Sequence, residues 1–285
     1  MAEDLQHRAM HEYYELGKEA DRLSTSGAGR LEFERTQEIV LRHLPPPPAT
    51  VADIGGGPGR YSLWLAGLGY RVVHRDIVPL HVDQVRAAAT PWPAEDAGAG
   101  LRSAGLAIDS ALGDARELDV ADASVDAVLL LGPLYHLGQR ADRVQALSEA
   151  RRIVRPGGPV FAAAISRWAT RLDVMLRLKV YEQVPEAADL MGPLERTGVM
   201  PALVPGGFNG FTHRPGQLRG EFRAAGLEVA DLVCVEGAAF LLNDLDDRAA
   251  DDRAWQVILD TARAHERVAE LMGLGSHLLG TGIRR

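Results

Sequence analysis

The residues of this sequence most clearly suited to bind a ligand form a glycine-rich turn with an aspartate just before it. Residues 51–66, VADIGGGPGRYSLWLA, begin as a short apolar strand and continue as an amphipathic helix. Gly55, Gly57 and Gly59 lie between the two, where the chain must reverse sharply and backbone can approach a ligand without a Cβ in the way. The first turn of the helix leaves N–H groups free for a carboxylate or phosphate. Asp53 ends the strand and adds a negative charge beside this turn.

The spacing of the glycines indicates which ligand the turn suits. A dinucleotide fold carries G-x-G-x-x-G, whereas Gly55, Gly57 and Gly59 give G-x-G-x-G and Arg60 stands at the third dinucleotide position. The carboxylate of Asp53 would repel a pyrophosphate, but it suits a ligand with an ammonium group. The pattern therefore favours a ligand with an ammonium group, while a nicotinamide dinucleotide stays an open alternative.

A second aspartate follows at the end of the next predicted strand. The segment 71–79, RVVHRDIVP, reads as a strand ending at Asp76, which lies 21 residues beyond Gly55. An acidic side chain at that offset can accept bonds from two ribose hydroxyls. This feature is shared by several nucleoside-binding enzymes, so it predicts a nucleoside without choosing among them.

The rest of the core predicts alternating strands and helices. An apolar run within residues 123–137 is typical of a buried parallel strand, and residues 142–166 read as a helix, a Pro-Gly-Gly turn and another strand. Ligands of open α/β sheets bind outside the carboxyl ends of the strands. Leu131, Tyr135 and His136 follow the buried strand and are expected there.

Several motifs occur in an order that resembles a known family. These are D-x-G-x-G-x-G at 53–59, L-G-D-A at 112–115 and LSEARRIVRPGG at 147–158, followed by a C-terminal helix–strand unit. Together they resemble the class I S-adenosylmethionine (SAM) methyltransferases over residues 51–285, apart from two insertions. The N-terminal helical segment, with YYELGKEADRL, resembles a bacterial subgroup that acts mostly on small molecules, often in specialised metabolism.

The resemblance implies an architecture. The expected fold is α/β, a doubly wound Rossmann-like sheet of seven strands in the order 3-2-1-4-5-7-6, with the last strand antiparallel and right-handed crossovers. A helical cap would span 1–44 and the SAM-binding core 49–166. A lid or substrate insertion would span 167–213, and 214–285 would complete the core with a helical insertion.

The resemblance also implies the cofactor and its contacts. S-adenosyl-L-methionine is the expected cofactor, with Asp114 bonding the adenine amino group, the Ala115 N–H meeting the ring, and Tyr14 and Arg22 reaching over the site. The cofactor-binding residues expected in this sequence are Tyr14, Arg22, Asp53, Gly55, Gly57, Asp76, Ile77, Asp114, Ala115 and Leu131.

Catalysis would need little beyond alignment of the methyl acceptor and exclusion of water. A general base is required only where the nucleophile is a protonated hydroxyl, amine or carbon acid. His136 and His213, both expected at the pocket rim, are the first candidates, and Tyr14 is a further one. The acceptor atom, whether O, N or C, stays open, and no metal is expected.

Bulk properties restrict the partners. The chain has 285 residues, 46% of them hydrophobic, a net charge of −8 and a pI of about 5.6. The acidic balance disfavours nucleic acid or an anionic membrane as partner, so a small-molecule acceptor is expected. A single cysteine, Cys234, excludes an intrachain disulfide. No long apolar run is present, and a cytoplasmic location is expected. A homodimer stays an open alternative to a monomer.

The sequence leaves three other functions open. A protein of the same fold could bind SAM without transferring a methyl group, as a regulator or as a cyclase. An NAD-dependent oxidoreductase is disfavoured by Asp53 and Arg60, and an RNA methyltransferase by the acidic charge balance.

Overall fold

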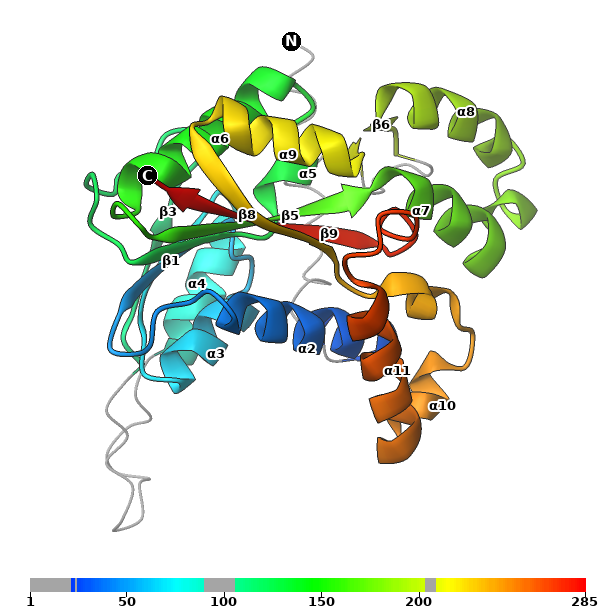
Figure 1. Cartoon of the computed structure of the whole chain (residues 1–285), viewed down its shortest axis with the longest axis horizontal. Coiled ribbons are helices and arrows are strands. Elements are labelled where there is room, and N and C mark those ends of the chain that lie inside the picture. Colours follow the sequence, from blue (N-terminus) through cyan, green and yellow to red (C-terminus); the bar gives the residue numbers. More distant parts are fainter. Residues whose placement is uncertain (1–21, 24, 90–105, 203–208) are drawn as a thin grey trace.

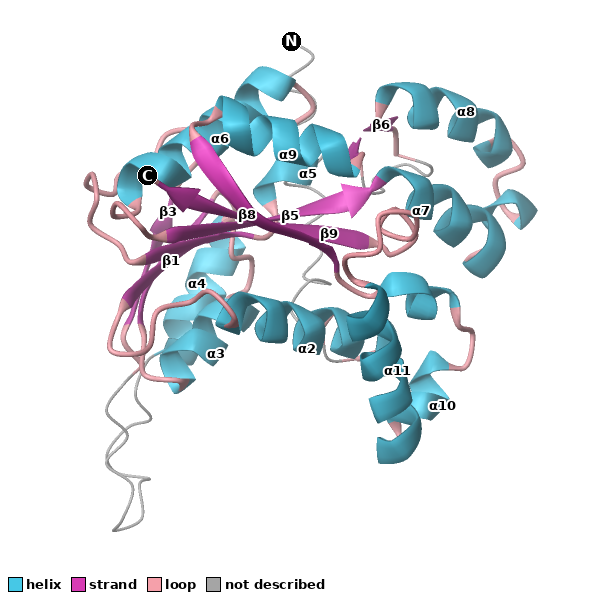
Figure 2. Ribbon diagram, viewed as in Figure 1, coloured by secondary structure: helices cyan, strands magenta, loops and turns pink. Residues whose placement is uncertain are grey.

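A twisted sheet covered by helices on both faces forms the centre of the computed structural model (Figures 1 and 2). The structure describes residues 22–23, 25–89, 106–202 and 209–285. Tyr14 and nearly all of the predicted first helix lie outside the described residues, as does most of the 90–107 segment. No helix in the described part of the chain is both long and apolar enough to cross a bilayer.

The main strands confirm the predicted sheet. Their order is β3-β2-β1-β4-β5, and β9 follows as an antiparallel strand between β5 and β8. Numbered as seven strands along the chain, this is the order 3-2-1-4-5-7-6. The bounds are β1 Thr50–Ile54, β2 Arg71–Asp76, β3 Ile108–Leu112, β4 Ala127–Leu130, β5 Pro159–Ser166, β8 Leu227–Cys234 and β9 His277–Arg284.

A short hairpin, β6 (Val199–Met200) and β7 (Gly210–His213), extends the sheet and was not predicted. β7 pairs in parallel with Ile165 and Ser166 of β5. β9 pairs with one edge of β5. β4 and β7 therefore share the other edge, where β4 pairs as far as Ala162 of β5 and β7 pairs beyond it. The surrounding residues are rich in proline and glycine and lack alternation, so their sequence gives no strand signal.

Helices cover the two faces of the sheet (Figure 1). One layer contains α5 Pro133–His136, α6 Arg140–Ile153 and α9 Pro215–Ala224; the other contains α2 Gly27–Leu41, α3 Arg60–Gly67 and α4 Pro79–Ala89, with α10 Leu245–Ala249 and α11 Asp252–His265 beside α2. Beyond the end of β5 lie α7 Arg167–Arg171, a π-helical turn (η1, Leu172–Arg177), a 3-10 turn (η2, Val180–Glu182) and α8 Ala187–Thr197; a further 3-10 turn (η3, Gly237–Leu241) follows β8. The apolar spacing of residues 167–184 predicts a single helix, but the structure divides this segment into α7, η1 and η2.

Helix α2 begins four residues earlier than the sequence indicates. The apolar positions within 31–44 predict a helix that starts at Leu31, but the Ser26 side chain accepts a hydrogen bond from the Gly29 N–H at 3.1 Å and caps the helix earlier. Gly29 is required because a Cβ would lie 2.2 Å from the carbonyl oxygen of Arg22. Glycine disfavours helix on intrinsic propensity, which is why the sequence pattern hides this first turn.

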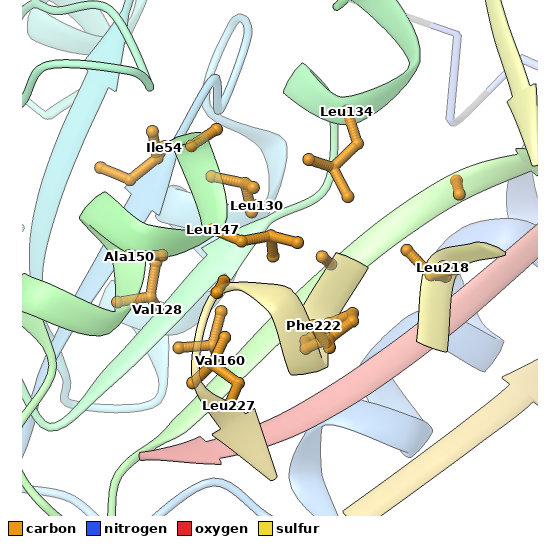
Figure 3. Packing of buried hydrophobic residues seen from close by; sticks show 14 of the residues in the cluster. Ile54, Val128, Leu130, Leu134, Leu147, Ala150, Val160, Leu218, Phe222 and Leu227 are labelled. Atoms are coloured by element: carbon orange, nitrogen blue, oxygen red, sulfur yellow. The ribbon is translucent and has the colours of Figure 1, made fainter. Parts of the chain in front are cut away.

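The layer between the sheet and helices α6 and α9 is packed around Phe222 (Figure 3). Its ring lies against Gly280 and Gly282 of β9, where a Cβ would come within 2.6 and 2.5 Å of ring carbons. Val160 and Leu227 belong to the same cluster. The two glycines therefore give α9 its close approach to the antiparallel strand.

Phe222→Ala is expected to destabilise the fold by about 3–5 kcal/mol, because it empties a fully buried aromatic site that rigid strands cannot refill. Chemical denaturation followed by circular dichroism measures the change. Arg223→Ala, one residue along at an exposed position of α9, is the matched control and should change stability by less than about 0.5 kcal/mol. Equal stabilities for the two variants would contradict the packing described here.

Candidate functional site

A cavity of about 1290 Å³, counting its open mouth, lies at the carboxyl ends of β1, β2 and β4. This edge is where open α/β sheets bind ligands. The glycine turn, the exits of three strands and the start of α2 all contribute to its wall. Every expected cofactor residue that the structure describes lies in that wall: Arg22, Asp53, Gly55, Gly57, Asp76, Ile77, Asp114, Ala115 and Leu131.

The glycine turn has a backbone shape that other residues would strain. Gly55, Gly57 and Gly59 all have positive φ values, of 65°, 57° and 85°. A Cβ on Gly55 would lie 2.6 Å from the ring of Pro133, at the start of α5. The turn is therefore held between β1 and the exit of β4, with bare backbone along the cavity.

Asp76 is fixed by the turn that it faces. Its Oδ2 accepts a hydrogen bond from the Gly57 N–H at 2.8 Å, and its Oδ1 accepts from the Val78 N–H at 2.8 Å and from His81 Nδ1 at 3.1 Å. Burial raises the pKa of the carboxyl, but the bonds from His81, Val78 and Gly57 outweigh it and hold the pKa below its usual range. A carboxylate can accept about four hydrogen bonds, so acceptor capacity is left on Oδ2 for a hydroxyl of a ligand.

Asp53 lies deeper, under the turn. Its Oδ2 accepts from the Ser62 hydroxyl at 2.7 Å, while Oδ1 is buried and has no hydrogen-bond partner among the described residues. Burial raises the pKa of this carboxyl, and the neighbouring charge of Asp76 adds to the rise. An acceptor left unpaired at the wall of a cavity fits a cationic group such as the ammonium of an amino-acid ligand.

His74 on β2 supports the same turn, and the sequence reasoning missed it. Its Nε2 lies 3.0 Å from the carbonyl oxygen of Gly57, and its Nδ1 lies 2.9 Å from the hydroxyl of Ser110 on β3. The imidazole thus ties the glycine turn to the neighbouring strands. A buried histidine within a strand has no local sequence signal, since its partners come from distant segments.

Asp114 and Ala115 form the turn that follows β3. Asp114 Oδ1 accepts from the Arg116 N–H at 2.8 Å, and Oδ2 makes an ion pair with the Arg116 guanidinium at 2.8 Å. These bonds orient the Asp114 carboxylate and leave about a third of its side chain exposed. The turn therefore presents an acceptor and a neighbouring backbone amide at one end of the cavity.

Arg22 enters the wall of the cavity through an ion pair. Its guanidinium donates to both carboxylate oxygens of Glu32 on α2, at 2.6 and 2.9 Å. Burial of Glu32 raises its pKa, but Arg22 and His277 outweigh burial and lower the pKa to about 2. The sequence placed Arg22 at the site but gave no reason to expect Glu32, whose partners are ten or more residues away.

His136, at the end of α5, lies in the wall as predicted. Burial lowers its pKa to about 4, against an opposing effect of Asp76. The ring is therefore neutral at physiological pH. It packs on Tyr135 with ring centroids 4.8 Å apart.

His213 is not at the cavity rim, where it was expected. It is fully buried at the end of β7, and its Nε2 lies 3.1 Å from Oε2 of Glu221 on α9. The other oxygen of Glu221 accepts two bonds from Arg143 of α6, at 3.0 and 2.8 Å. The unpredicted β7 turns His213 toward this buried network, which explains the difference.

The predicted insertion contributes other side chains than those expected. The apolar side chains of this insertion, among them Trp168, Met175, Met191 and Phe211, predict an apolar substrate wall, but none of these four lines the cavity at the glycine turn. Met191 and Phe211 are buried, Phe211 beneath the Arg143 guanidinium at 3.7 Å. Phe208, a further candidate, lies outside the described residues.

A second cavity, of about 990 Å³, lies next to the first and shares Arg22, Glu32 and His277 with it. The start of α2, the end of β5, α7 and η1 supply most of the remaining wall, and Met200, Glu236, Phe240 and Ser276 complete it. His277 and Glu236, which meet at this boundary, had no place in the sequence reasoning. They come from the start of β9 and the end of β8, so the antiparallel pairing brings them together.

Comparison with known proteins agrees with this geometry. Residues 52–162 match the family model described as a methyltransferase domain. The ubiquinone/menaquinone biosynthesis C-methyltransferase UbiE of Acidiphilium cryptum is 33% identical over 150 residues, 52% of this chain and 53% of that protein. The malonyl-acyl-carrier-protein O-methyltransferase of Methylococcus capsulatus is 33% identical over 134 residues, 46% of this chain and 44% of that protein. The chain spans about half the length of the curated relatives it matches.

Solved structures extend the likeness of the fold beyond that domain. The cyclase SpnF has a TM-score of 0.53 and 18% sequence identity to this chain, covering 88% of it and 80% of the SpnF chain. The glycine turn, Asp76 and the L-G-D-A turn all fall within the matched segment 52–162. Residues 52–162 are thus a methyltransferase domain of the class I type, for which S-adenosyl-L-methionine is the cofactor.

Proposed function

We propose that this protein transfers a methyl group from S-adenosylmethionine to an O, N or C atom of a small molecule. One observation carries the proposal: the glycine turn, Asp76 and Asp114 come from separate segments and line a single cavity. Bound S-adenosylmethionine would supply an electrophilic methyl group on its sulfonium.

Different residues of the cavity wall would contact different parts of the cofactor. Asp76 accepts bonds from the ribose hydroxyls, because its carboxylate is already aimed by the Gly57 and Val78 amides. Asp114 accepts from the adenine amino group, and the Ala115 N–H meets the ring. Ile77 and Leu131 give the nucleoside apolar contacts. The positions of these residues in the wall of one cavity support the assignments.

The glycine turn and Asp53 hold the amino-acid end. Gly55 and Gly57 bring backbone close to the carboxylate, and the unpaired Oδ1 of Asp53 attracts the ammonium. Arg22, paired with Glu32, closes the same side of the cavity. His136 stays neutral and orients the acceptor through its ring, since its low pKa makes it a weak base.

Calorimetry with S-adenosylmethionine and S-adenosylhomocysteine tests the proposal. Micromolar binding of both to the purified full chain is expected, with no change in NADH fluorescence on adding the protein. Small-molecule acceptors, including phenols, amines and carbon acids, would then be screened for S-adenosylhomocysteine release. A folded protein that binds neither compound would overturn the proposal and return the dinucleotide alternative.

A second function of the same fold is cyclisation without methyl transfer, favoured by the structural likeness to SpnF. Both functions predict cofactor binding, so binding alone does not separate them. Product analysis does: methyl transfer consumes S-adenosylmethionine in proportion to product, whereas cyclisation leaves it unchanged.

A further inference from the structure

A histidine and a glutamate meet at the edge of the sheet where the strands end. β8 runs parallel to the core strands and is followed by Glu236, while β9 runs antiparallel and begins at His277. His277 therefore lies at the carboxyl edge of the sheet, opposite Ile165 of β5. The two residues are joined twice: Glu236 Oε1 lies 2.5 Å from His277 Nδ1, and Oε2 accepts from the His277 N–H at 2.9 Å.

This contact leaves one ring nitrogen of His277 for a ligand. Glu236 is a carboxylate acceptor, so Nδ1 carries a proton and its bond fixes the orientation of the ring. Nε2 has no hydrogen-bond partner among the described residues, and the side chain remains about one-fifth exposed. His277 lines both cavities, so Nε2 is the nitrogen available at their boundary.

The second cavity is suited to a small amphiphilic molecule. Its wall includes the apolar side chains of Ile165, Val174, Met200 and Phe240. Asp173 and Arg177 add charges that are paired with each other. The residues shared with the cofactor cavity are polar, so the polar end of an occupant would face the cofactor and its apolar part would face away.

A metal ion is the competing occupant, because ligand atoms of Glu32, Glu236 and His277 lie within 4.8 Å of one another. The bonds already present argue against it. Both oxygens of Glu32 are held by the Arg22 guanidinium, and both oxygens of Glu236 by His277. A metal would have to displace a cation from Glu32 and a proton from His277 Nδ1.

We propose that the second cavity binds the methyl acceptor, that this acceptor carries a phenolic or enolic hydroxyl, and that Nε2 of His277, oriented by Glu236, takes its proton. The inference rests on the methyl-transfer function proposed above and names its substrate class. The hydroxyl proton passes to Nε2 and the oxygen bonds the methyl carbon. The carbon–sulfur bond then breaks with its electron pair on sulfur.

The surrounding charges support this class of acceptor. Burial lowers the pKa of His277, but Glu236 and Glu32 outweigh burial and an opposing effect of Arg22, and they raise the pKa to about 9. With this pKa the ring is mainly imidazolium at neutral pH, and the neutral form that accepts the proton becomes the main form only above about pH 9, so methyl transfer is expected to rise with pH up to that value. Transfer of the proton to the neutral ring costs little free energy where the hydroxyl has a similar pKa. A phenol resembles tyrosine, with a pKa of ~10, whereas an alkyl alcohol resembles water, at ~16.

The first test measures the ring itself and needs no acceptor. In NMR titrations of the full chain with S-adenosylhomocysteine, the His277 resonance, identified by its loss in His277→Asn, is expected to titrate near pH 9. In Glu236→Gln its midpoint should fall toward about 6.5, because the negative charge is removed while an acceptor oxygen stays. A wild-type midpoint at or below about 6.5 would overturn the proposal.

The second test uses para-nitrophenol as probe, because its phenolate absorbs visible light. With S-adenosylhomocysteine present, wild-type protein is expected to bind the probe and raise its phenolate fraction below its free pKa. Para-nitroanisole and para-nitrobenzyl alcohol, which lack an acidic hydroxyl, should bind at least tenfold more weakly. In His277→Asn, whose amide can replace Nδ1 toward Glu236, para-nitrophenol affinity should fall at least tenfold.

The controls separate this proposal from the function on which it rests. Both variants should still bind S-adenosylhomocysteine at micromolar concentration, since Asp76 and the glycine turn are unchanged. Two results would overturn the acceptor site while leaving the methyl-transfer proposal intact. In both, the protein binds S-adenosylhomocysteine; in the first, wild type and His277→Asn bind the probe equally, and in the second, neither binds it. A shift of the His277 resonance by Mg²⁺ or Zn²⁺ that EDTA reverses would overturn the acceptor site in favour of a metal site.

Discussion

Asp76→Asn is expected to weaken binding of S-adenosylmethionine and S-adenosylhomocysteine by about 100-fold, or about 2.7 kcal/mol. The carboxylate is held by the Gly57 and Val78 amides and by His81, and it lies at the cavity wall. An asparagine has only one acceptor oxygen, so its amide nitrogen would face one of these donors. The variant would lose both the charge-assisted bonds to ribose and part of the order of the glycine turn. Calorimetry at one fixed salt concentration measures the change.

The matched control is Asp83→Asn on the neighbouring helix α4. Asp83 is about three-quarters exposed, and among the residues that the structure describes it lies 3.9 Å from Arg86. This substitution removes the same charge from a nearby position that does not line the cavity. The affinity for the cofactor should therefore stay within about twofold of wild type. A folded Asp76→Asn protein with wild-type affinity would show that the ribose is held by other residues.

Glu221→Gln is expected to lower the free energy of unfolding by about 3–5 kcal/mol, as for other buried pairs that lose one partner. Glu221 lies between Arg143 and His213, and all three side chains are buried. Removing its charge leaves the Arg143 guanidinium without a counter-charge in the core. Arg143 also donates to the carbonyls of Leu137 and Gly138, at 2.8 and 2.9 Å. The loss should therefore also loosen the segment that follows His136.

Denaturation curves of Glu221→Gln and Glu228→Gln test this expectation. Glu228 pairs with Arg285 at the surface, and exposed pairs contribute little, so the control should be close to wild type. His213→Asn should likewise reduce stability more than cofactor affinity. A His213→Asn protein of unchanged stability that has lost turnover would restore the predicted role of His213 as a proton acceptor.

Much of the cofactor cavity could be predicted because its residues lie in short, continuous motifs. The glycine turn follows Asp53 directly, Asp76 ends the next strand, and Asp114 and Ala115 stand in one tetrapeptide. Each motif fixes a local backbone shape. The order of parallel strands then brings their carboxyl ends to one edge.

The residues that were missed or misplaced depend on pairing between distant segments. His213 was expected at the pocket rim, but β7 pairs with β5 and directs it toward Glu221. The Arg22–Glu32 and His277–Glu236 contacts join residues ten and 41 positions apart. Neither spacing corresponds to a helical or strand period, so no sequence pattern marks them.

The sequence by itself determined the alternation of strands and helices and a nucleoside site, because periodicity, turn glycines and strand-end aspartates act over a few residues; the strand order and the cofactor followed from the resemblance of its motifs to the class I methyltransferases. Only the tertiary structure decided which ionisable groups share a cavity and which are buried as structural pairs. That difference is physical: the protonation and reach of His136, His213 and His277 depend on burial and on charges from other elements.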